Sequence, residues 1–144
     1  MSSILSIDYG TKRIGLAVSD PKRIFAFPAG VIQNDNMNKV ILEIKKIIFE
    51  KEVDLILVGM PYDLNANKKL DSEPGNMMKT VQKFVKRLQA EVNINVETID
   101  ETLSSFAAEE NLRESGVSSK RLKEFVDQEA ARLILEEYMK KNII

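Results

Sequence analysis

The chain has 144 residues, 44% of them hydrophobic, and a formal net charge of −1 from 21 basic and 22 acidic side chains. This length and apolar content predict one domain, residues 1–144, with a substantial core. The absence of cysteine and histidine excludes disulfides, thiolate metal sites and imidazole catalysis. No apolar run approaches the ~20 residues that cross a bilayer, and the chain starts directly on a strand pattern, so we expect a cytoplasmic protein.

The first part of the chain predicts three strands. Residues 3–8 and 13–19 are rich in Ile, Leu and Val and are separated by a short turn, which is typical of an antiparallel pair. Residues 24–32 predict a third strand. Pro28 places it at a sheet edge, because proline has no N–H to donate to a central ladder.

A helix, a central strand and a second helix follow. Asn34, Asp35 and Asn36 are candidate caps for a helix whose apolar residues between 37 and 48 recur on one face. The nearly continuous apolar run 53–59 predicts a strand covered on both faces. Residues 61–75 are polar and rich in Asn, Pro and Gly, which favours a loop. Residues 77–88 again show the spacing of one helical face.

The last third predicts one more strand and two helices. Residues 94–99 read as a strand, and 103–113 as a helix that ends before Gly116. A short basic connection, 118–123, is expected to lead into a final helix from about 125 to 141. This order predicts an α/β fold with a mixed five-stranded sheet: an antiparallel meander, then parallel strands added through right-handed crossovers, with helices on both faces.

Three carboxylates stand at unusual positions in this pattern. Asp8 closes the first apolar strand, and Glu101 directly follows the last one. Because the carboxyl ends of parallel strands meet at one edge, both side chains should reach that edge. Asp127 falls within the apolar stripe of the final helix, which includes Ala131 and Leu135.

Each acid also has a simpler structural explanation. Asp8 could accept hydrogen bonds from the turn around Gly10 and Thr11, whereas Glu101 and Asp127 could be ordinary acids in the first turn of a helix. Convergence of all three at one edge favours a cation, because neighbouring carboxylates repel one another. Ligation by oxygen alone indicates Mg²⁺ or Mn²⁺.

The turn after Asp8 carries groups suited to phosphate. Gly10 permits a tight backbone, and Thr11, Lys12 and Arg13 add hydroxyl, amide and cationic donors. Lys120 and Arg121 form a second basic group. The alternative is that all of these are solvated surface side chains.

Four segments together resemble one protein family. They are Asp8-Tyr9-Gly10-Thr11-Lys12-Arg13-Ile14-Gly15, Val58-Gly59-Met60-Pro61, Asp100-Glu101-Thr102-Leu103 and Val126-Asp127-Gln128-Glu129-Ala130-Ala131. In this order and spacing they resemble the YqgF family, also called RuvX or Holliday junction resolvase-like proteins, whose members are named as pre-16S ribosomal RNA nucleases.

The resemblance implies a ribonuclease H-like fold and metal-dependent hydrolysis of phosphodiesters in 5′-end processing of pre-16S ribosomal RNA. Asp8, Glu101 and Asp127 match the acidic motif positions, so they are the expected catalytic and metal-binding residues. One or two Mg²⁺ or Mn²⁺ ions would activate a water. Gly10, Thr11, Lys12, Arg13, Lys120 and Arg121 are the expected substrate-binding residues. The chain departs from the family pattern at Thr102 and Asn76, where arginine is usual.

Other functions remain open on sequence alone. A four-way DNA junction presents the same phosphates, and its resolution requires a symmetric dimer, so a monomer and a homodimer are both considered. A non-catalytic RNA-binding ribosome assembly factor is a further alternative. The Asp-x-Gly-Thr opening also occurs in sugar kinases and actin-like ATPases, which enclose their nucleotide between two such domains.

Overall fold

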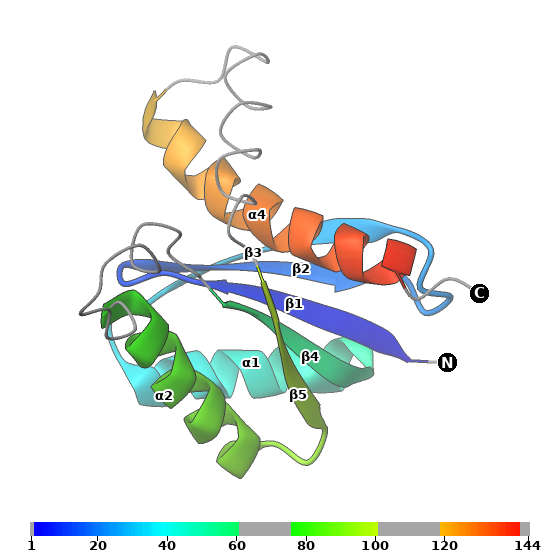
Figure 1. Cartoon of the computed structure of the whole chain (residues 1–144), viewed down its shortest axis with the longest axis horizontal. Coiled ribbons are helices and arrows are strands. Elements are labelled where there is room, and N and C mark those ends of the chain that lie inside the picture. Colours follow the sequence, from blue (N-terminus) through cyan, green and yellow to red (C-terminus); the bar gives the residue numbers. More distant parts are fainter. Residues whose placement is uncertain (1, 61–75, 101–118, 142–144) are drawn as a thin grey trace, which may run out of the picture.

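A five-stranded mixed sheet forms the centre of the molecule in a computed structural model, which describes residues 2–60, 76–100 and 119–141 (Figure 1). The strands are β1 (Ser3–Tyr9), β2 (Arg13–Ser19), β3 (Ala26–Gln33), β4 (Val53–Met60) and β5 (Asn95–Asp100), in the spatial order β3-β2-β1-β4-β5. β1, β2 and β3 pair antiparallel, and β4 pairs parallel with both β1 and β5. The predicted meander with added parallel strands is confirmed.

Helices cover both faces of this sheet (Figure 1). α1 (Met37–Lys51) and α2 (Asn76–Glu91) lie on one face, and α4 (Ser119–Lys141) crosses β1, β2 and β3 on the other. None of the helices in the described part of the chain is both long and apolar enough to span a bilayer.

Alternate residues of β1 supply two separate cores, as the period of two in a strand requires. Leu5, Ile7 and Tyr9 face α1 and α2 and join the larger cluster. There the ring centroids of Tyr9 and Phe84 are 4.5 Å apart. Ile4 faces α4 and joins a smaller cluster with Ala17, Leu55, Leu57, Ala131, Leu135 and Met139. The α4 face therefore holds fewer large apolar side chains. Polar side chains of β1 lie on that face near the end of the strand.

The final helix begins earlier than the sequence pattern predicted. The expected connection 118–123 belongs to α4 from Ser119 onward. Lys, Arg and Leu are strong helix formers, and no Gly or Pro interrupts the segment, so the helix extends through it.

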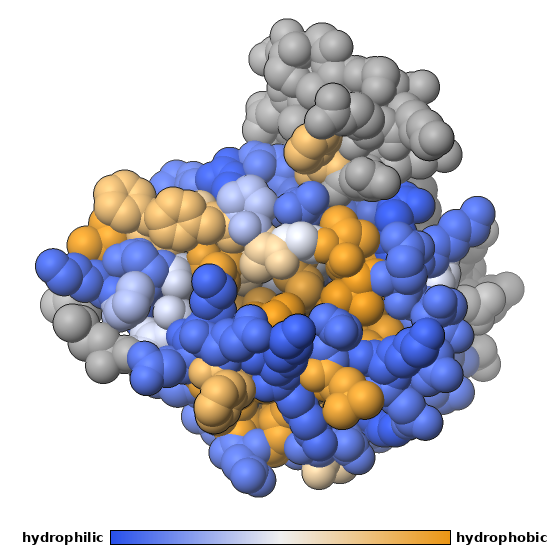
Figure 2. All heavy atoms as spheres, turned by 180° about the vertical axis from the view of Figure 1, so that it is seen from behind, coloured by the Kyte–Doolittle hydropathy of each residue, from blue (hydrophilic) through white to orange (hydrophobic). Residues whose placement is uncertain are grey.

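The edge strand β3 begins two residues later than expected. It lies at the sheet edge, as Pro28 predicted, and a bulge interrupts its pairing with β2 between Leu16 and Ala17. Ile24 and Phe25 precede the strand and are 60% and 61% exposed. Figure 2, the view from behind, shows apolar side chains at the surface among the polar ones.

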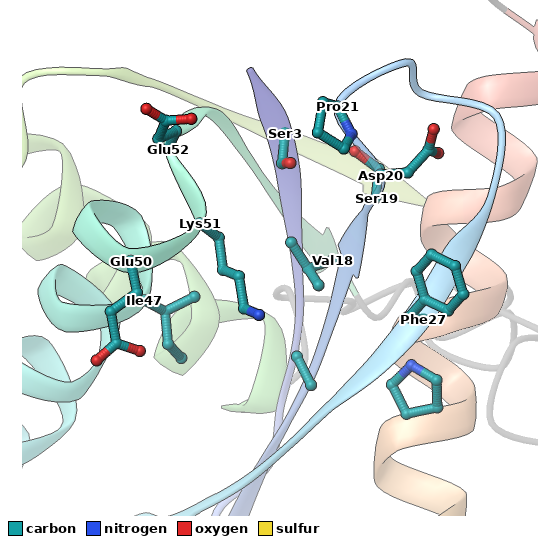
Figure 3. Close-up of a pocket in the computed structure, with 12 residues that line it drawn as sticks. Ser3, Val18, Ser19, Asp20, Pro21, Phe27, Ile47, Glu50, Lys51 and Glu52 are labelled. Atoms are coloured by element: carbon teal, nitrogen blue, oxygen red, sulfur yellow. The ribbon is translucent and has the colours of Figure 1, made fainter. Parts of the chain in front are cut away.

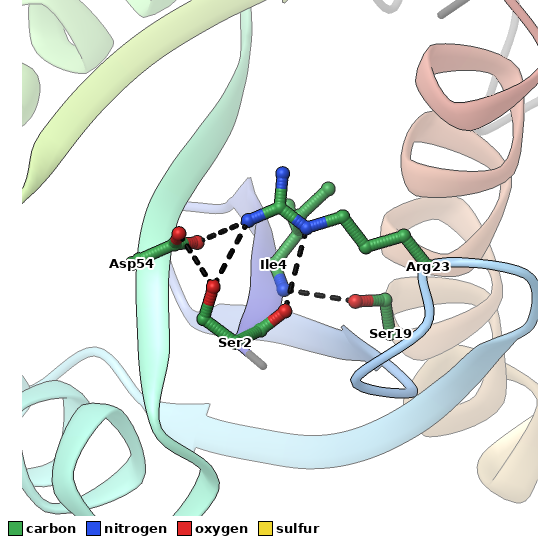
Figure 4. A network of polar contacts seen from close by, with 5 residues as sticks. All are labelled: Ser2, Ile4, Ser19, Arg23 and Asp54. Atoms are coloured by element: carbon green, nitrogen blue, oxygen red, sulfur yellow. Dashed lines mark hydrogen bonds and ion pairs between the residues drawn. The ribbon is translucent and has the colours of Figure 1, made fainter. Parts of the chain in front are cut away.

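A polar network fixes the sheet at the amino end of β1 (Figure 4). Arg23 pairs with Asp54 of β4, and the Ser2 hydroxyl donates to the same carboxylate at 2.6 Å. Asp20 accepts from the backbone N–H groups of Ile24 and Phe25, each at 2.7 Å. These backbone donors, that of Phe25 foremost, lower the pKa of Asp20. The network joins the β2–β3 turn to β4, far along β1 from Asp8.

The N-cap of α1 gives the first testable prediction. The Asn36 side-chain oxygen accepts from the backbone N–H groups of Asn38 at 3.0 Å and Lys39 at 3.3 Å. Asn36→Ala should lower the free energy of unfolding by ~1 kcal/mol, because it leaves these donors without the cap, while Asn36→Asp should retain most of the stability. Urea denaturation measures both. Asp35→Ala, a change at an exposed neighbour that does not cap the helix, is the control. Equal losses for Asn36→Ala and Asp35→Ala would contradict this assignment.

Candidate metal and nucleic-acid site

Asp8 lies near the carboxyl end of β1, on the face that α4 covers. Ser6, two residues earlier on the same face, is fully buried, and its hydroxyl donates to the Ala131 carbonyl of α4 at 2.6 Å. Asp8 itself is partly exposed. It pairs in register with Gly15 of β2, so these two residues lie side by side beneath the amino-terminal half of α4.

A close backbone approach places Asp127 over this pair. A Cβ atom built on Gly15 would lie 2.0 Å from the Asp127 carbonyl oxygen and 3.0 Å from its Cα. The backbone of α4 thus rests on the bare backbone of β2 at this residue. Asp127 precedes Ala131 by about 6 Å of helix rise, and Asp8 follows Ser6 by about 6.6 Å of strand. These similar separations agree with the position of Asp127 over Gly15, the register partner of Asp8.

Arg13 bridges the β1–β2 turn to Asp127. Its Nε donates to Oδ2 of Asp127 at 2.7 Å, and the two side chains are 27% and 19% exposed. Burial raises the pKa of Asp127, and the Arg13 hydrogen bond and charge act in the opposite direction. The sequence predicted that Arg13 would bind substrate phosphate. In the structure it is the partner of a predicted metal ligand.

The remaining residues of the turn are presented to solvent. Gly10 permits a sharp reversal, since a Cβ there would lie 2.3 Å from the Arg13 carbonyl oxygen. Thr11 and Lys12 are exposed. Asn34, just after β3, holds the turn from both sides: its side chain donates to the Gly10 carbonyl at 2.8 Å, and its N–H donates to the Lys12 carbonyl at 2.9 Å.

Three predicted site residues have no described side chain. Glu101 follows Asp100, where β5 ends at the same edge of the sheet as β1, and lies outside the described residues, as do the predicted loop 61–75 and helix 103–113. Lys120 and Arg121 belong to the first turn of α4. Among the described residues, no group of three acids forms a metal cluster. The predicted trio therefore stays a prediction; of its members, Asp127 lies against Gly15, which pairs in register with Asp8.

Two contacts of the site were not anticipated from sequence. Asn34 was considered only as a helix cap, yet it holds the turn beside Asp8. Gln128 accepts the Gly30 N–H at 3.2 Å and so links α4 to the bulge in β3. The only sequence signal for Gln128 was its polar character beside Asp127, because its partner is 98 residues away in sequence.

A pocket elsewhere on the molecule does not include these residues (Figure 3). It has a volume of about 790 Å³ and lies at the other end of β1, between Ser3, the end of β2 and the last turn of α1. Acidic Asp20, Glu50 and Glu52 line it together with Lys51. Its position and negative charge do not suit phosphate bound at the Asp8 edge.

Comparison with known proteins decides the family. The model of the RuvX family, described as Holliday junction resolvase, matches residues 2–141. The chain belongs to this family. Relatives named "Putative pre-16S rRNA nuclease" include one from Maridesulfovibrio salexigens, 38% identical over 94% of this chain and 96% of its own length. Another, from Endomicrobium trichonymphae, is 36% identical over 96% of both chains.

Solved structures share the fold of this RuvX member. T. thermophilus RuvC in complex with a Holliday junction substrate superposes with a TM-score of 0.59 at 14% identity, covering 99% of this chain and 97% of that chain. The yeast mitochondrial Holliday junction resolvase gives 0.54 at 11% identity, covering 96% and 78%. The predicted ribonuclease H-like fold and the predicted nuclease family are confirmed, so the chain is a phosphodiester hydrolase that binds nucleic acid. Nucleases of this kind use divalent metal ions.

The close approach at Gly15 gives the second prediction. Gly15→Ala should lower the free energy of unfolding by ~3 kcal/mol or displace α4, because the added methyl group meets backbone rather than a flexible side chain. Gly30→Ala is the matched control. Gly30 has φ +103 but open space around its Cβ position, so that change should cost only the ~1–2 kcal/mol of backbone strain. Thermal unfolding measures both. A Gly15→Ala variant no less stable than Gly30→Ala would refute the contact.

Proposed function

We propose that this protein is a Mg²⁺- or Mn²⁺-dependent nuclease of the cytoplasm that processes the 5′ end of pre-16S ribosomal RNA. The whole chain would act as one nuclease domain. The observation that carries the proposal is the close approach of Asp127 on α4 to Gly15, the register partner of Asp8, in a ribonuclease H-like sheet. The names of the relatives at 36–38% identity supply the choice of substrate.

The donor set fits a hard divalent cation. Asp8 and Asp127 approach from β1 and α4 with carboxylate oxygens, the ligands that Mg²⁺ and Mn²⁺ prefer. Glu101, which follows the end of β5, would be the third ligand by its motif. A bound divalent ion supplies a water of lowered pKa and stabilises negative charge on the phosphate.

The chain's own residues would bind and orient the substrate. Thr11 and Lys12 are exposed at the turn, where they can contact phosphates of the backbone. Asn34 keeps that turn beside Asp8 through its two hydrogen bonds. Lys120 and Arg121 would extend the basic surface from the first turn of α4. None of these groups reads bases, so the choice of substrate would depend on the shape of the RNA.

Resolution of a Holliday junction is the second candidate function. The description of the family favours it, since it names Holliday junction resolvases. A resolvase cuts two strands symmetrically and therefore needs two active sites in a homodimer. The processing of one RNA end requires only one site, so a monomer suffices. The oligomeric state in solution bears directly on this choice.

Substitution of Asp8 tests the activity itself. With Mg²⁺, Asp8→Asn and Asp127→Asn should each slow cleavage of a pre-16S RNA fragment by ~100-fold or more, because each removes one charged ligand. Asp54→Asn is the control, since this acid lies at the opposite end of the sheet, paired with Arg23. Gel assays of initial rates with Mg²⁺, Mn²⁺ or EDTA measure the effect. Full activity in a folded Asp8→Asn variant would refute the assignment.

The same assay separates the candidate functions. Cleavage of the RNA fragment by a monomer, with an intact four-way DNA junction, supports RNA processing. Paired cuts in the junction by a dimer, with intact RNA, would favour the resolvase. Tight RNA binding that EDTA leaves unchanged, without cleavage of either substrate, would indicate the non-catalytic assembly factor.

A further inference from the structure

The Arg13–Asp127 ion pair is held in place by two rigid elements. Arg13 is the first residue of β2 and pairs in register with Gln33 of β3. Asp127 is fixed by the contact of its backbone with Gly15. The 2.7 Å bond between their side chains therefore follows from the placement of β2 and α4 and joins residues 114 positions apart.

This pair conflicts with the binding of a cation at Asp127. A guanidinium group at Oδ2 and a divalent ion on the same carboxylate repel each other, and the repulsion is poorly screened where both side chains are mostly buried. The guanidinium group supplies positive charge at this carboxylate in the described structure, so Arg13 acts as a substitute for the ion.

A second partner for Arg13 is available in the proposed reaction. Its neighbours Thr11 and Lys12 are exposed on the same turn, where a phosphate would approach. Arginine binds phosphate with two parallel hydrogen bonds, as it does carboxylate. The Arg13 side chain is 27% exposed and is bound to Asp127. A change of its rotamer would therefore be sufficient for it to exchange the carboxylate for a phosphate.

We propose that Arg13 is an exchangeable counter-ion, which holds the Asp127 carboxylate in the ion-free protein and moves to a substrate phosphate when a divalent ion takes that carboxylate. The proposal rests on the proposed metal-dependent function. In this proposal Arg13 couples ion binding to substrate binding. If Arg13 instead only held the Asp127 carboxylate in position for the ion, it would be necessary for ion affinity. The two roles predict opposite signs for the same substitution.

The first experiment measures ion affinity by isothermal titration calorimetry of the full chain with Mn²⁺. Arg13→Gln should bind the ion about tenfold more tightly than the wild type, because a competing cation and its repulsion are removed. Arg13→Lys keeps the charge and should stay close to the wild type. Arg132→Gln is the matched control: it removes an arginine from α4, the helix that carries Asp127, but one that pairs with Glu129 and Glu136.

The second experiment measures the coupling to substrate. Fluorescence anisotropy with a short labelled single-stranded RNA compares EDTA with Ca²⁺, and a gel confirms that the RNA stays intact. In EDTA the wild type and Arg13→Gln should bind RNA equally, because Arg13 is held by Asp127. With Ca²⁺ the wild type should bind about tenfold more tightly than Arg13→Gln, the effect of one charge-assisted contact. A merely structural role would lower RNA binding equally in both conditions.

The outcomes separate this proposal from the proposed function. One outcome overturns the exchange alone. In it, Asp8→Asn loses ion binding, while Arg13→Gln binds the ion no more tightly than the wild type does; the metal-dependent function then still stands. No ion binding in the wild type overturns both. Tighter ion binding in Arg13→Gln, together with a loss of RNA affinity confined to Ca²⁺, supports the exchange. Circular dichroism checks that each variant is folded. If Arg13→Gln is unstable, Arg13→Lys replaces it in the RNA titration, where loss of the two parallel hydrogen bonds to phosphate should weaken binding with Ca²⁺ but not in EDTA; equal binding in Ca²⁺ would overturn the phosphate step.

Discussion

The contact of the α4 backbone with Gly15 is the constraint on which the site depends. A helix packs on a sheet at a distance set by the side chains between them, and here one residue of the sheet has no side chain. α4 therefore descends at Asp127 until backbone meets backbone. This close approach places Asp127 next to the strand residue that pairs with Asp8, because Gly15 and Asp8 are register partners.

Other contacts along α4 reinforce the same placement. The Ser6 hydroxyl binds the Ala131 carbonyl one turn further on, and Gln128 binds the bulge of β3. Small residues, Ala130 and Ala131, are fully buried where the helix meets the sheet. The apolar cluster on this face is smaller than that under α1 and α2, so polar contacts contribute more to the position of α4. A buried polar pair has a narrower range of acceptable geometries than an apolar contact, so it specifies position more sharply.

The electrostatics of the site follow from this geometry. A largely buried carboxylate such as that of Asp127 needs positive charge nearby. In the described structure Arg13 of the β1–β2 turn provides it for Asp127. At the amino end of β1 a separate network, in which Arg23 pairs with Asp54, joins the β2–β3 turn to β4.

The sequence by itself determined the strands and helices of the described residues, their order and most of the directions of pairing. Apolar periodicity and the Pro and Gly positions are local signals, and they were sufficient for the mixed sheet, the edge position of β3 and the cap of α1. The sequence also indicated Asp8 and Asp127, because a carboxylate at the end of an apolar strand or within an apolar stripe is visible without coordinates. It misplaced the start of α4, which begins at Ser119 and not at about residue 125.

Only the tertiary structure decided how deep α4 lies and which partner each polar group takes. Arg13 and Asp127 are 114 residues apart, and Gly30 and Gln128 are 98 apart, so no local pattern relates them. Asn34 is close to Gly10 in space because β3 returns beside β2, not because of any spacing in the chain. Such contacts depend on the relative height and rotation of packed elements, and these are set by the sum of many side-chain volumes across the interface.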